Sequence, residues 1–570
     1  MRPWLAVGLL FPGMVACVGR SGDSPGPGPA GDADVDSEGA PESRPPPSDN
    51  VIDVAIWPSF TTRGLAAPKR AGTVELCRRL SLDLFGTIPS RDDLAFCDGK
   101  TPAQIAEAFM ARPEFTTRER ALWIQHLRED PSRIAAEYCV DADKIIDALS
   151  SGKLAYDAFA ARILAHPVMA LNHTPFAGGY DDGSDHKQDV AKNAYRVFLG
   201  RVAVGLEARD LANLFRGWKR VELTRSKTTG SWFHRDGDMT DGITIGLATL
   251  TVKPCTDSTF GSAPCTSRLI GDKTTLALPA TYEGAAYESF AGSVPEALQT
   301  ELEKPGRLLS TRQEFWDEAA DHALQRFLGW WKSTLAEPDT DVPEVRAALS
   351  KWFRATPDHD IRKLYATIIG SLLYSSAAAV DAGTPEALPV WAAGPTKELE
   401  PTQWADSVGK VWALALNTGF CDVHTSDSSG YPLYFPNSLR APSPVTKPYG
   451  YAGFYQSFLA DLGGCKGAVA PSRDIFLSKV FIHASYARSI CMGSELPIAP
   501  DGYDFADVSE ANVRKLLSFA FVRLLSREPN DVELAASIKA SGCLKATCDL
   551  KVFAGELCSG ILRSTGWTFY

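Results

Sequence analysis

The chain of 570 residues has few of the short motifs by which enzyme classes are recognised. HExxH and GxxxxGK[ST] do not occur, and GxSxG and GxGxxG occur only in the Pro- and Gly-rich stretch 18–50. The sequence therefore lacks the usual parts of a zincin, a nucleotide-binding enzyme or a serine hydrolase, although a new kind of site needs no known motif. A surplus of basic residues is also missing. The net charge of −11 and the absence of a Lys/Arg-rich run argue against a nucleic-acid partner.

The first fifty residues contain no element that could join a packed core. Residues 1–16 have one early positive charge, an apolar run and a small residue before Cys17, as in a signal peptide. The ending MVAC resembles the lipobox of bacterial lipoproteins, which implies lipidation of Cys17 and, with Val18 next, an outer-membrane or cell-surface location. Ordinary secretion to the periplasm or medium is the alternative. Residues 17–50 then form an acidic linker without aromatic residues, which we expect to be disordered.

Cysteine usage favours an oxidising compartment. The chain has twelve cysteines and no CxxC or CxxCH motif. Reduced, buried thiols are the alternative, because spacing does not fix connectivity. The disulfide candidates are Cys77, Cys97, Cys255, Cys265, Cys543 and Cys548.

The stretch LCRRLSLDLFGTIPSRDDL, residues 76–94, predicts a helical hairpin. Its leucines follow helical spacing, Gly86 supplies a C-terminal stop and Pro89 blocks continuation. Ser90 stands three residues before Asp93, which is the spacing of an N-terminal cap.

The stretch VRKLLSFAFVRLLSREPNDVEL, residues 513–534, repeats this pattern near the other end of the chain. Pro529 precedes Leu534 by the same interval as Pro89 precedes Leu94, and Asn530 and Glu533 take the capping roles. We expect two similar hairpins flanking the body. True duplication and convergence on one packing solution both remain open.

These residues carry a resemblance to a family. The 76–94 stretch, FMARPEF, LAYDAFAARILAHP and YRVFLGRVAVGLEARDLANLFRGW resemble, in that order, the planctomycete cytochrome-like domain of unknown function 1549. SFAFVRLLSREPNDVEL and LCSGILRSTGWTFY resemble the end of its companion, domain of unknown function 1553. The resemblance covers residues 76–218 and 513–570 and implies a helical frame.

That family normally carries a CxxCH haem-attachment motif shortly after the FLG segment. Here Phe198, Leu199 and Gly200 are followed by RVAVGLEARDL, which has neither the two cysteines nor the histidine. Haem attachment at this point is therefore excluded, and a binding or structural role is favoured over a redox role.

The best metal candidate is the loop SWFHRDGDMTDGITIG, and no other cofactor is expected. Alternating carboxylates before a glycine can wrap calcium, but the loop lacks the Gly and Glu of the calcium-loop template, so a polar turn is the competing interpretation. The candidate ligands are His234, Asp236, Asp238 and Asp241. GGYDDGSDH, residues 178–186, has the same composition.

The middle of the chain is less specific. Thr, Gly and β-branched residues at 224–293 predict a small β-containing insertion, including strands in DGITIGLATLTVK and TTLALPATYEG. Leu324, Phe327, Leu328, Trp331 and Leu335 have helical spacing, and Trp330 with Trp331 could line a groove but more commonly form core. The Tyr-rich loops between Tyr431 and Tyr455 suit polysaccharide or protein contact.

The sequence thus predicts a mainly α protein, a multi-helix body of helical hairpins with a small β-rich insertion. The function it favours is that of a lipid-anchored surface or periplasmic binding or scaffold component without catalysis. The alternatives are a metal-dependent enzyme or redox subunit using the 234–241 loop, and a carbohydrate-binding protein. The predicted divisions are 1–16 signal peptide, 17–50 anchor and linker, 71–223 N-terminal helical domain, 224–293 insertion, 300–420 central helices, 421–470 loops and 471–570 C-terminal helical domain.

Overall fold

The computed structural model of the protein describes separate stretches of the chain. They are residues 48–62, 68–127, 136–166, 183–215, 296–330, 342–377, 397, 399–411, 477–493, 498–541 and 548–564, with a few single positions and the backbone of short strands between 218 and 279. These residues are mainly helical, which confirms the predicted fold class. Among them, no helix is both long and apolar enough to cross a bilayer.

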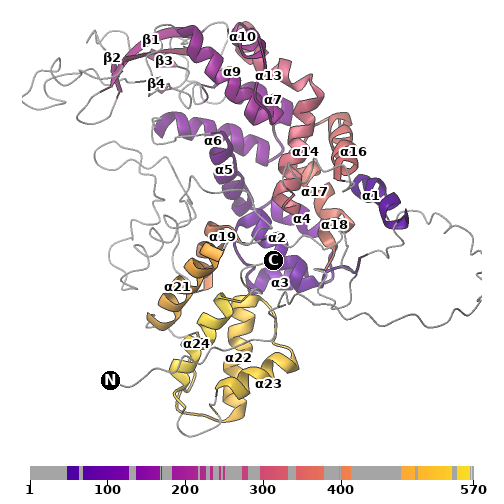
Figure 1. Cartoon of the computed structure of the whole chain (residues 1–570), viewed down its shortest axis with the longest axis vertical. Coiled ribbons are helices and arrows are strands. Elements are labelled where there is room, and N and C mark those ends of the chain that lie inside the picture. Colours follow the sequence, from indigo (N-terminus) through magenta and orange to yellow (C-terminus); the bar gives the residue numbers. More distant parts are fainter. Residues whose placement is uncertain are drawn as a thin grey trace, which may run out of the picture.

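Most helices belong to an N-terminal body with one continuous apolar core (Figure 1). Its early helices are α1 (Val51–Thr62), α2 (Thr73–Phe85), α3 (Arg91–Cys97), α4 (Pro102–Met110), α5 (Pro113–Leu127), α6 (Ala136–Ser150), α7 (Tyr156–Ala165), α9 (Gly183–Leu199) and α10 (Glu207–Ala212). Its later helices are α13 (Glu296–Ser310), α14 (Gln313–Leu328), α16 (Val342–Ala355), α17 (Ile361–Gly370) and α18 (Leu372–Ser375).

A second, smaller core lies in a C-terminal unit at the opposite end of the molecule (Figure 1). It consists of α19 (Pro401–Val411), α21 (Leu477–Gly493), α22 (Glu510–Leu525), α23 (Asp531–Ser541) and α24 (Leu550–Leu562). Leu82 and Ile88, from the N-terminal hairpin, also belong to this core.

Short antiparallel strands occur between the two groups of N-terminal helices. Strand β1 (Trp218–Arg225) pairs with β2 (Trp232–His234) and with β5 (Lys273–Pro279), and β3 (Ile243–Ile245) pairs with β4 (Ala248–Leu250). β3, β4 and β5 fall in the two stretches predicted as strands, whereas β1 begins before the predicted boundary at Thr224. Most of 224–293 lies outside the described residues, so the insertion as a domain stays a prediction.

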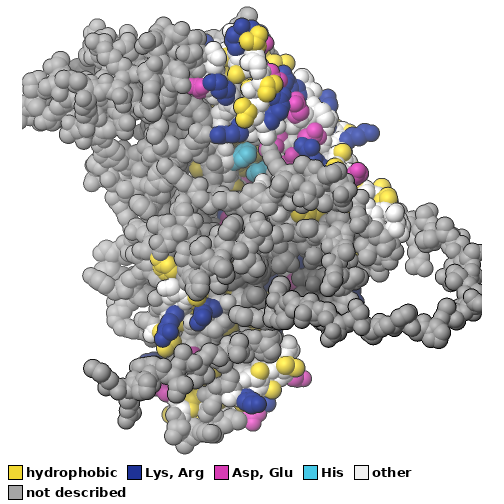
Figure 2. Space-filling model, viewed as in Figure 1, with side chains coloured by type: hydrophobic (Ala, Val, Ile, Leu, Met, Phe, Trp, Pro, Cys, Tyr) yellow, Lys and Arg dark blue, Asp and Glu magenta, His cyan; other side chains and the backbone are white. Residues whose placement is uncertain are grey.

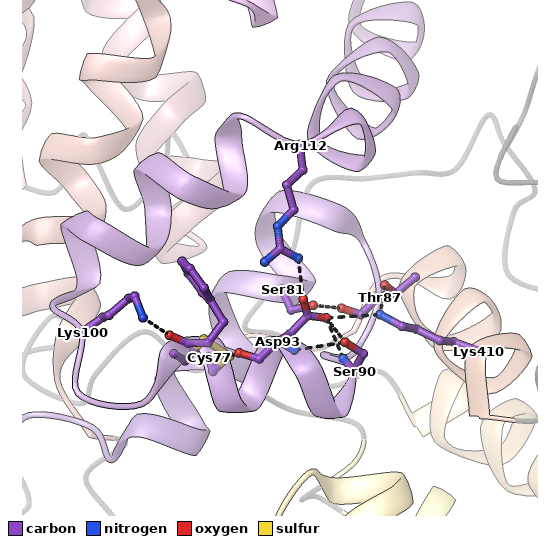
Figure 3. The surroundings of a disulfide bond; sticks show 10 residues. Cys77, Ser81, Thr87, Ser90, Asp93, Lys100, Arg112 and Lys410 are labelled. Atoms are coloured by element: carbon purple, nitrogen blue, oxygen red, sulfur yellow. Dashed lines mark hydrogen bonds and ion pairs between the residues drawn. A yellow bond between two sulfur atoms is a disulfide. The ribbon is translucent and has the colours of Figure 1, made fainter.

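The predicted hairpin of residues 76–94 is formed by α2 and α3. Gly86 has a φ of 77°, and its N–H donates to the carbonyl of Leu82 at 3.0 Å, which ends α2. Ser90 and Asp93 form the reciprocal capping box that starts α3: the Asp93 N–H donates to Ser90 Oγ at 3.1 Å, and the Ser90 N–H donates to Asp93 Oδ2 at 2.7 Å. Figure 3 shows Arg112 reaching the same carboxylate as an ion pair.

The C-terminal hairpin of α22 and α23 repeats this geometry. Ser526, at φ 61°, takes the place of Gly86, and its N–H donates to the carbonyl of Val522 at 3.1 Å. The Glu533 N–H donates to Asn530 Oδ1 at 2.8 Å, and the Asn530 N–H donates to Glu533 Oε2 at 2.9 Å. Both hairpin predictions are confirmed in their turns and caps.

The helix predicted to run through Leu324 to Leu335 is shorter than its apolar spacing suggested. Helix α14 ends at Leu328, because Gly329 adopts the left-handed conformation with φ 66° and its N–H closes on the carbonyl of Gln325. Helix α14 therefore ends before Trp331 and Leu335, which lie outside the described residues. Trp330 is 1% exposed and belongs to the core.

Three pairs of cysteines are bonded in the described residues. Cys77 joins Cys97 across the first hairpin, and Cys543 joins Cys548, as their positions suggested. Cys558 joins Cys491, linking α24 to α21, a partner that the sequence did not indicate. Cys255 and Cys265 lie outside the described residues.

The two C-terminal disulfides should differ in their contribution to stability. Cys491 and Cys558 are separated by 67 positions and Cys543 and Cys548 by 5. Because closing a longer loop removes more entropy from the unfolded chain, we expect a loss of about 4 kcal/mol for Cys491→Ala/Cys558→Ala and about 2 kcal/mol for Cys543→Ala/Cys548→Ala. Denaturant unfolding of both double variants measures this, and equal losses would contradict it.

Candidate functional site: a buried charge network around α2

The residues singled out in the sequence as a metal site lie mostly outside the described residues. His234 is the last residue of β2, whereas Asp236, Asp238 and Asp241 are not described. Cys17 and the Tyr-rich loops of 431–455 are also outside. Within the described part of the chain, no group of three or more His, Cys, Asp and Glu side chains stands close enough to hold a metal ion.

Among the described residues, helix α2 carries a set of charged side chains that are buried. Each face of this helix is marked by residues four apart, which lie one above the other on a helix. Leu76, Leu80 and Leu84 enter the larger core, while the carboxylate of Asp83 and the guanidinium of Arg79 form a second face of charged groups. Arg79 is 1% exposed and Asp83 is 3% exposed, so these charges are removed from water.

Asp83 forms an ion pair with Lys397, a residue far away in the sequence. The two side chains are 1% and 0% exposed, respectively. Tyr374 Oη donates to the other carboxylate oxygen of Asp83 at 2.8 Å, and Lys397 Nζ also donates to the backbone carbonyl of Arg326 at 3.1 Å. Arg79 fixes the same region because its guanidinium donates to the carbonyls of Tyr374, at 2.5 Å, and Ser376, at 2.9 Å.

A second buried ion pair joins α5 to α14. The Arg326 guanidinium binds the Glu119 carboxylate and donates to the backbone carbonyl of Asp83 at 3.0 Å. Tyr365 Oη donates to Glu119 Oε2 at 3.2 Å, and the guanidinium lies over the Tyr365 ring at 4.9 Å. The preceding residue of α5, Arg118, pairs with Glu400 at 2.7 Å.

Burial and neighbouring charge set the titration of these groups. Burial lowers the pKa of Lys397 to about 8, against the opposing attraction of Asp83. Burial also raises the pKa of Tyr365 well above its ordinary value, and the Glu119 charge adds to this effect. For Arg326, burial is the largest single effect and would lower the pKa, but Glu119, Tyr365 and Asp83 together outweigh it and the pKa is raised, so this guanidinium stays charged.

The charged groups hold together segments that are far apart in sequence: α2, α5, α14, α17, α18 and the stretch before α19. A buried ion pair gains little net stability, because desolvation offsets the Coulomb attraction, but a chain that misplaces one partner leaves an unpaired charge in the interior. The network therefore specifies how these segments meet. The one group in it with a nucleophilic atom and a lowered pKa is Lys397.

A third face of α2 joins the two cores. Arg78, which is buried, donates to the backbone carbonyls of Leu524 at 3.0 Å and Trp567 at 3.4 Å, and lies over the Trp567 ring at 5.4 Å. Leu82, one turn later on this face, packs into the C-terminal core, and its carbonyl accepts from the Gln403 side chain at 2.9 Å. The C-terminal unit is thus attached to the body through α2.

The loop that follows α9 is held by ion pairs and exposes aliphatic side chains. Val202, Val204 and Leu206 are 72%, 64% and 56% exposed. Glu207 clamps the loop: its carboxylate accepts two hydrogen bonds from Arg201, at 2.7 and 2.9 Å, and one from the Val204 N–H at 2.9 Å.

Further contacts tie this clamp to the start of α14. Arg312 donates to Glu207 at 3.1 Å, and Arg201 donates to Glu314 at 2.9 Å.

Chiefly through the hydrogen bond from Arg201, the pKa of Glu207 is lowered to about 2. Its stabilising effect is therefore complete above its ordinary value near 4.5 and is lost as the pH falls toward 2. Figure 2 shows hydrophobic side chains beside Lys and Arg side chains at the end of the molecule where α10 lies.

The sequence alone did not find the charge network. Its signal is present in LCRRLSLDLF, where two arginines and an aspartate interrupt a helix that is otherwise apolar. Such charges indicate either a solvated face or buried partners. The partners here stand 314 positions away for Asp83 and Lys397 and 295 positions away for Arg79 and Tyr374. Spacing along one helix could not choose between the two interpretations.

Removing one partner of the buried Glu119–Arg326 pair should be strongly destabilising. Glu119→Gln leaves a guanidinium in the interior without its counter-charge, so we expect the free energy of unfolding to fall by about 3 kcal/mol. The matched control is Glu510→Gln, whose pair with Arg514 is about half exposed on both sides, with an expected loss of less than about 0.5 kcal/mol. Denaturant titration compares them, and similar losses would show that the buried network does not specify the fold.

One part of the chain matches the model of a known protein family. Residues 51–203 match the family model PSCyt2, described as a protein of unknown function (DUF1549). The match covers α1 to α9 and stops at Ala203, inside the exposed loop. Neither a curated protein nor a solved structure matches the chain. The resemblance of the C-terminal hairpin to domain 1553 stays a prediction. The N-terminal stretch 51–203 is thus similar to the PSCyt2 (DUF1549) family.

Proposed function

We propose that this protein is a lipid-anchored, extracytoplasmic binding or scaffold component that performs no catalysis itself. The observation that carries the proposal is the exposed loop of Val202, Val204 and Leu206. It leads directly into residues 205–209, where the family resemblance would place two cysteines and a histidine for haem, and it presents aliphatic side chains to solvent. In this proposal, the protein uses this position to bind a partner and not to carry out a redox reaction.

The partner that fits this loop is a protein with an apolar contact patch. Exposed aliphatic side chains gain free energy by leaving water on binding. Charges of both signs surround the loop, with Arg201 and Glu207 already paired and Arg209 beside Asp210, so no strong charge attraction to an acidic or basic surface is expected. A polysaccharide is the less favoured partner, because the loop has no aromatic or amide side chain with which to recognise a sugar.

The proposed extracytoplasmic, lipid-anchored location is inferred from the cysteines and from the N-terminal sequence. Disulfides bind together helices of both the N-terminal body and the C-terminal unit, at Cys77–Cys97 and Cys491–Cys558, and such bonds persist in oxidising compartments. The MVAC sequence ending at Cys17 supplies the expected lipid attachment, and the linker to residue 50 would hold the folded body away from the membrane.

Contact through the loop can be tested with a photo-crosslinking residue placed at Val204 in cells. We expect a discrete protein adduct at this position. The control position is Val532 on α23, which is 72% exposed, against 64% for Val204, but belongs to the C-terminal unit. No adduct at 204, or the same adducts at both positions, would overturn the loop as a specific contact surface.

Lipid anchoring predicts that substitution of Cys17 changes the membrane association of the protein. The unaltered chain should fractionate with membranes and resist extraction by salt, because acyl chains rather than charges hold it. Cys17→Ala should release the processed protein into the soluble fraction or leave its signal peptide uncleaved. Membrane association unchanged in the variant, with a cleaved N-terminus, would contradict the anchor.

The metal-dependent or redox alternative has its own direct measurement. Metal analysis and an absorption spectrum of purified residues 51–570 test it in one sample. Neither a Soret band nor a stoichiometric metal is expected. Either one would instead favour a cofactor site in the residues around 234–241.

A further inference from the structure

The buried Lys397–Asp83 pair places an amine directly against a carboxyl group. Lys397 Nζ contacts Asp83 Oδ1, and both side chains are shielded from water, at 0% and 1% exposed. The two residues are 314 positions apart, so only the folded chain brings them together. This geometry is what an intramolecular condensation between an amine and a carboxylic acid requires, because the fold supplies the proximity that two free groups in water lack.

Burial also favours the reactive, neutral form of the Lys397 amine. An ammonium and a carboxylate become a neutral amine and a neutral acid when one proton crosses the hydrogen bond between them, with no net change in protons. The interior disfavours the charged forms, and burial already lowers the pKa of the Lys397 amine to about 8. Arg79, a fixed positive charge nearby, adds to this lowering.

The surrounding groups hold both reactants in position. Tyr374 Oη donates to Asp83 Oδ2 at 2.8 Å, on the carboxyl oxygen away from the amine, and could stabilise negative charge that develops there. The carbonyl of Arg326 accepts a hydrogen bond from Lys397 Nζ at 3.1 Å and orients the amine. The Arg79 guanidinium holds the Tyr374 backbone through its carbonyl at 2.5 Å.

We propose that Lys397 and Asp83 join in an intramolecular isopeptide bond that cross-links α2 to the segment preceding α19. The neutral Nζ attacks Cγ of the protonated Asp83 carboxyl group and forms a C–N bond. The carbon–Oδ1 bond breaks, and Oδ1 leaves as water after receiving the carboxyl proton and one proton from Nζ. Oδ2 becomes the amide oxygen and keeps the hydrogen bond from Tyr374. Nothing is oxidised or reduced, and no co-reactant is needed.

The bond would convert a charge pair into a neutral amide inside the protein. It would also lock the centre of the charge network by a link that reductants do not open, unlike the disulfides of the same body. This inference is independent of the proposed function, because it concerns only the chemistry of three buried side chains.

The deciding measurement is the intact mass of the purified full-length chain after complete reduction and denaturation. We expect the protein to be lighter than its sequence by one water molecule. A protease digest should contain one branched peptide that joins the segment of Asp83 to the segment of Lys397, which distinguishes the cross-link from dehydration of an aspartate within one segment. A wild-type protein at full mass with two separate peptides would overturn the proposal and leave an ion pair.

Two variants add chemical controls. Lys397→Arg keeps the positive charge but removes the nucleophilic amine, so it should have the full mass and no branched peptide. Tyr374→Phe keeps the ring but removes the hydroxyl that donates to Asp83, so cross-linking should be slower or incomplete in a time course after refolding. A branched peptide in Lys397→Arg, or unchanged kinetics in Tyr374→Phe, would contradict the assigned roles, and the wild-type mass is decisive even where a variant fails to fold.

Discussion

The burial of α2 on three faces is the constraint on which the rest of the structure depends. Residues four apart divide the helix into an apolar face of Leu76, Leu80 and Leu84, a charged face of Arg79 and Asp83, and a third face of Arg78 and Leu82. Each face meets a different part of the chain. The helix therefore fixes the N-terminal core, the charge network and the C-terminal unit relative to one another.

The charged face has a cost that the fold must offset. Ionised side chains leave water at a penalty that their mutual attraction only partly recovers, so the network adds little stability by itself. What it adds is selectivity among arrangements, because Arg326, Glu119 and Lys397 are satisfied together only when α5, α14 and the segment before α19 meet α2 correctly. A neutral amide between Lys397 and Asp83 would remove part of that penalty permanently.

The two hairpins show how the same local rules act at both ends of the chain. A left-handed residue ends the first helix, and a polar side chain with an acidic partner three residues later begins the second. In the first hairpin the left-handed residue is Gly86, and in the second it is Ser526, which lacks glycine's freedom at positive φ. The turn is therefore imposed in the second case by the caps and by packing as well as by the residue itself.

The sequence by itself determined the features that depend on near neighbours. Helix stops, capping boxes and the helical fold class follow from spacings of a few residues up to one hairpin. The sequence also marked Cys77, Cys97, Cys543 and Cys548 as disulfide candidates without fixing their pairing. It overextended α14 past Gly329, since apolar spacing continues there although the backbone turns. Only the tertiary structure decided that Cys491 pairs with Cys558, that the charges of α2 are buried, and that Lys397 lies against Asp83. Those pairings join positions tens to hundreds of residues apart, and a one-dimensional pattern carries no information about which distant group fills the space beside a side chain.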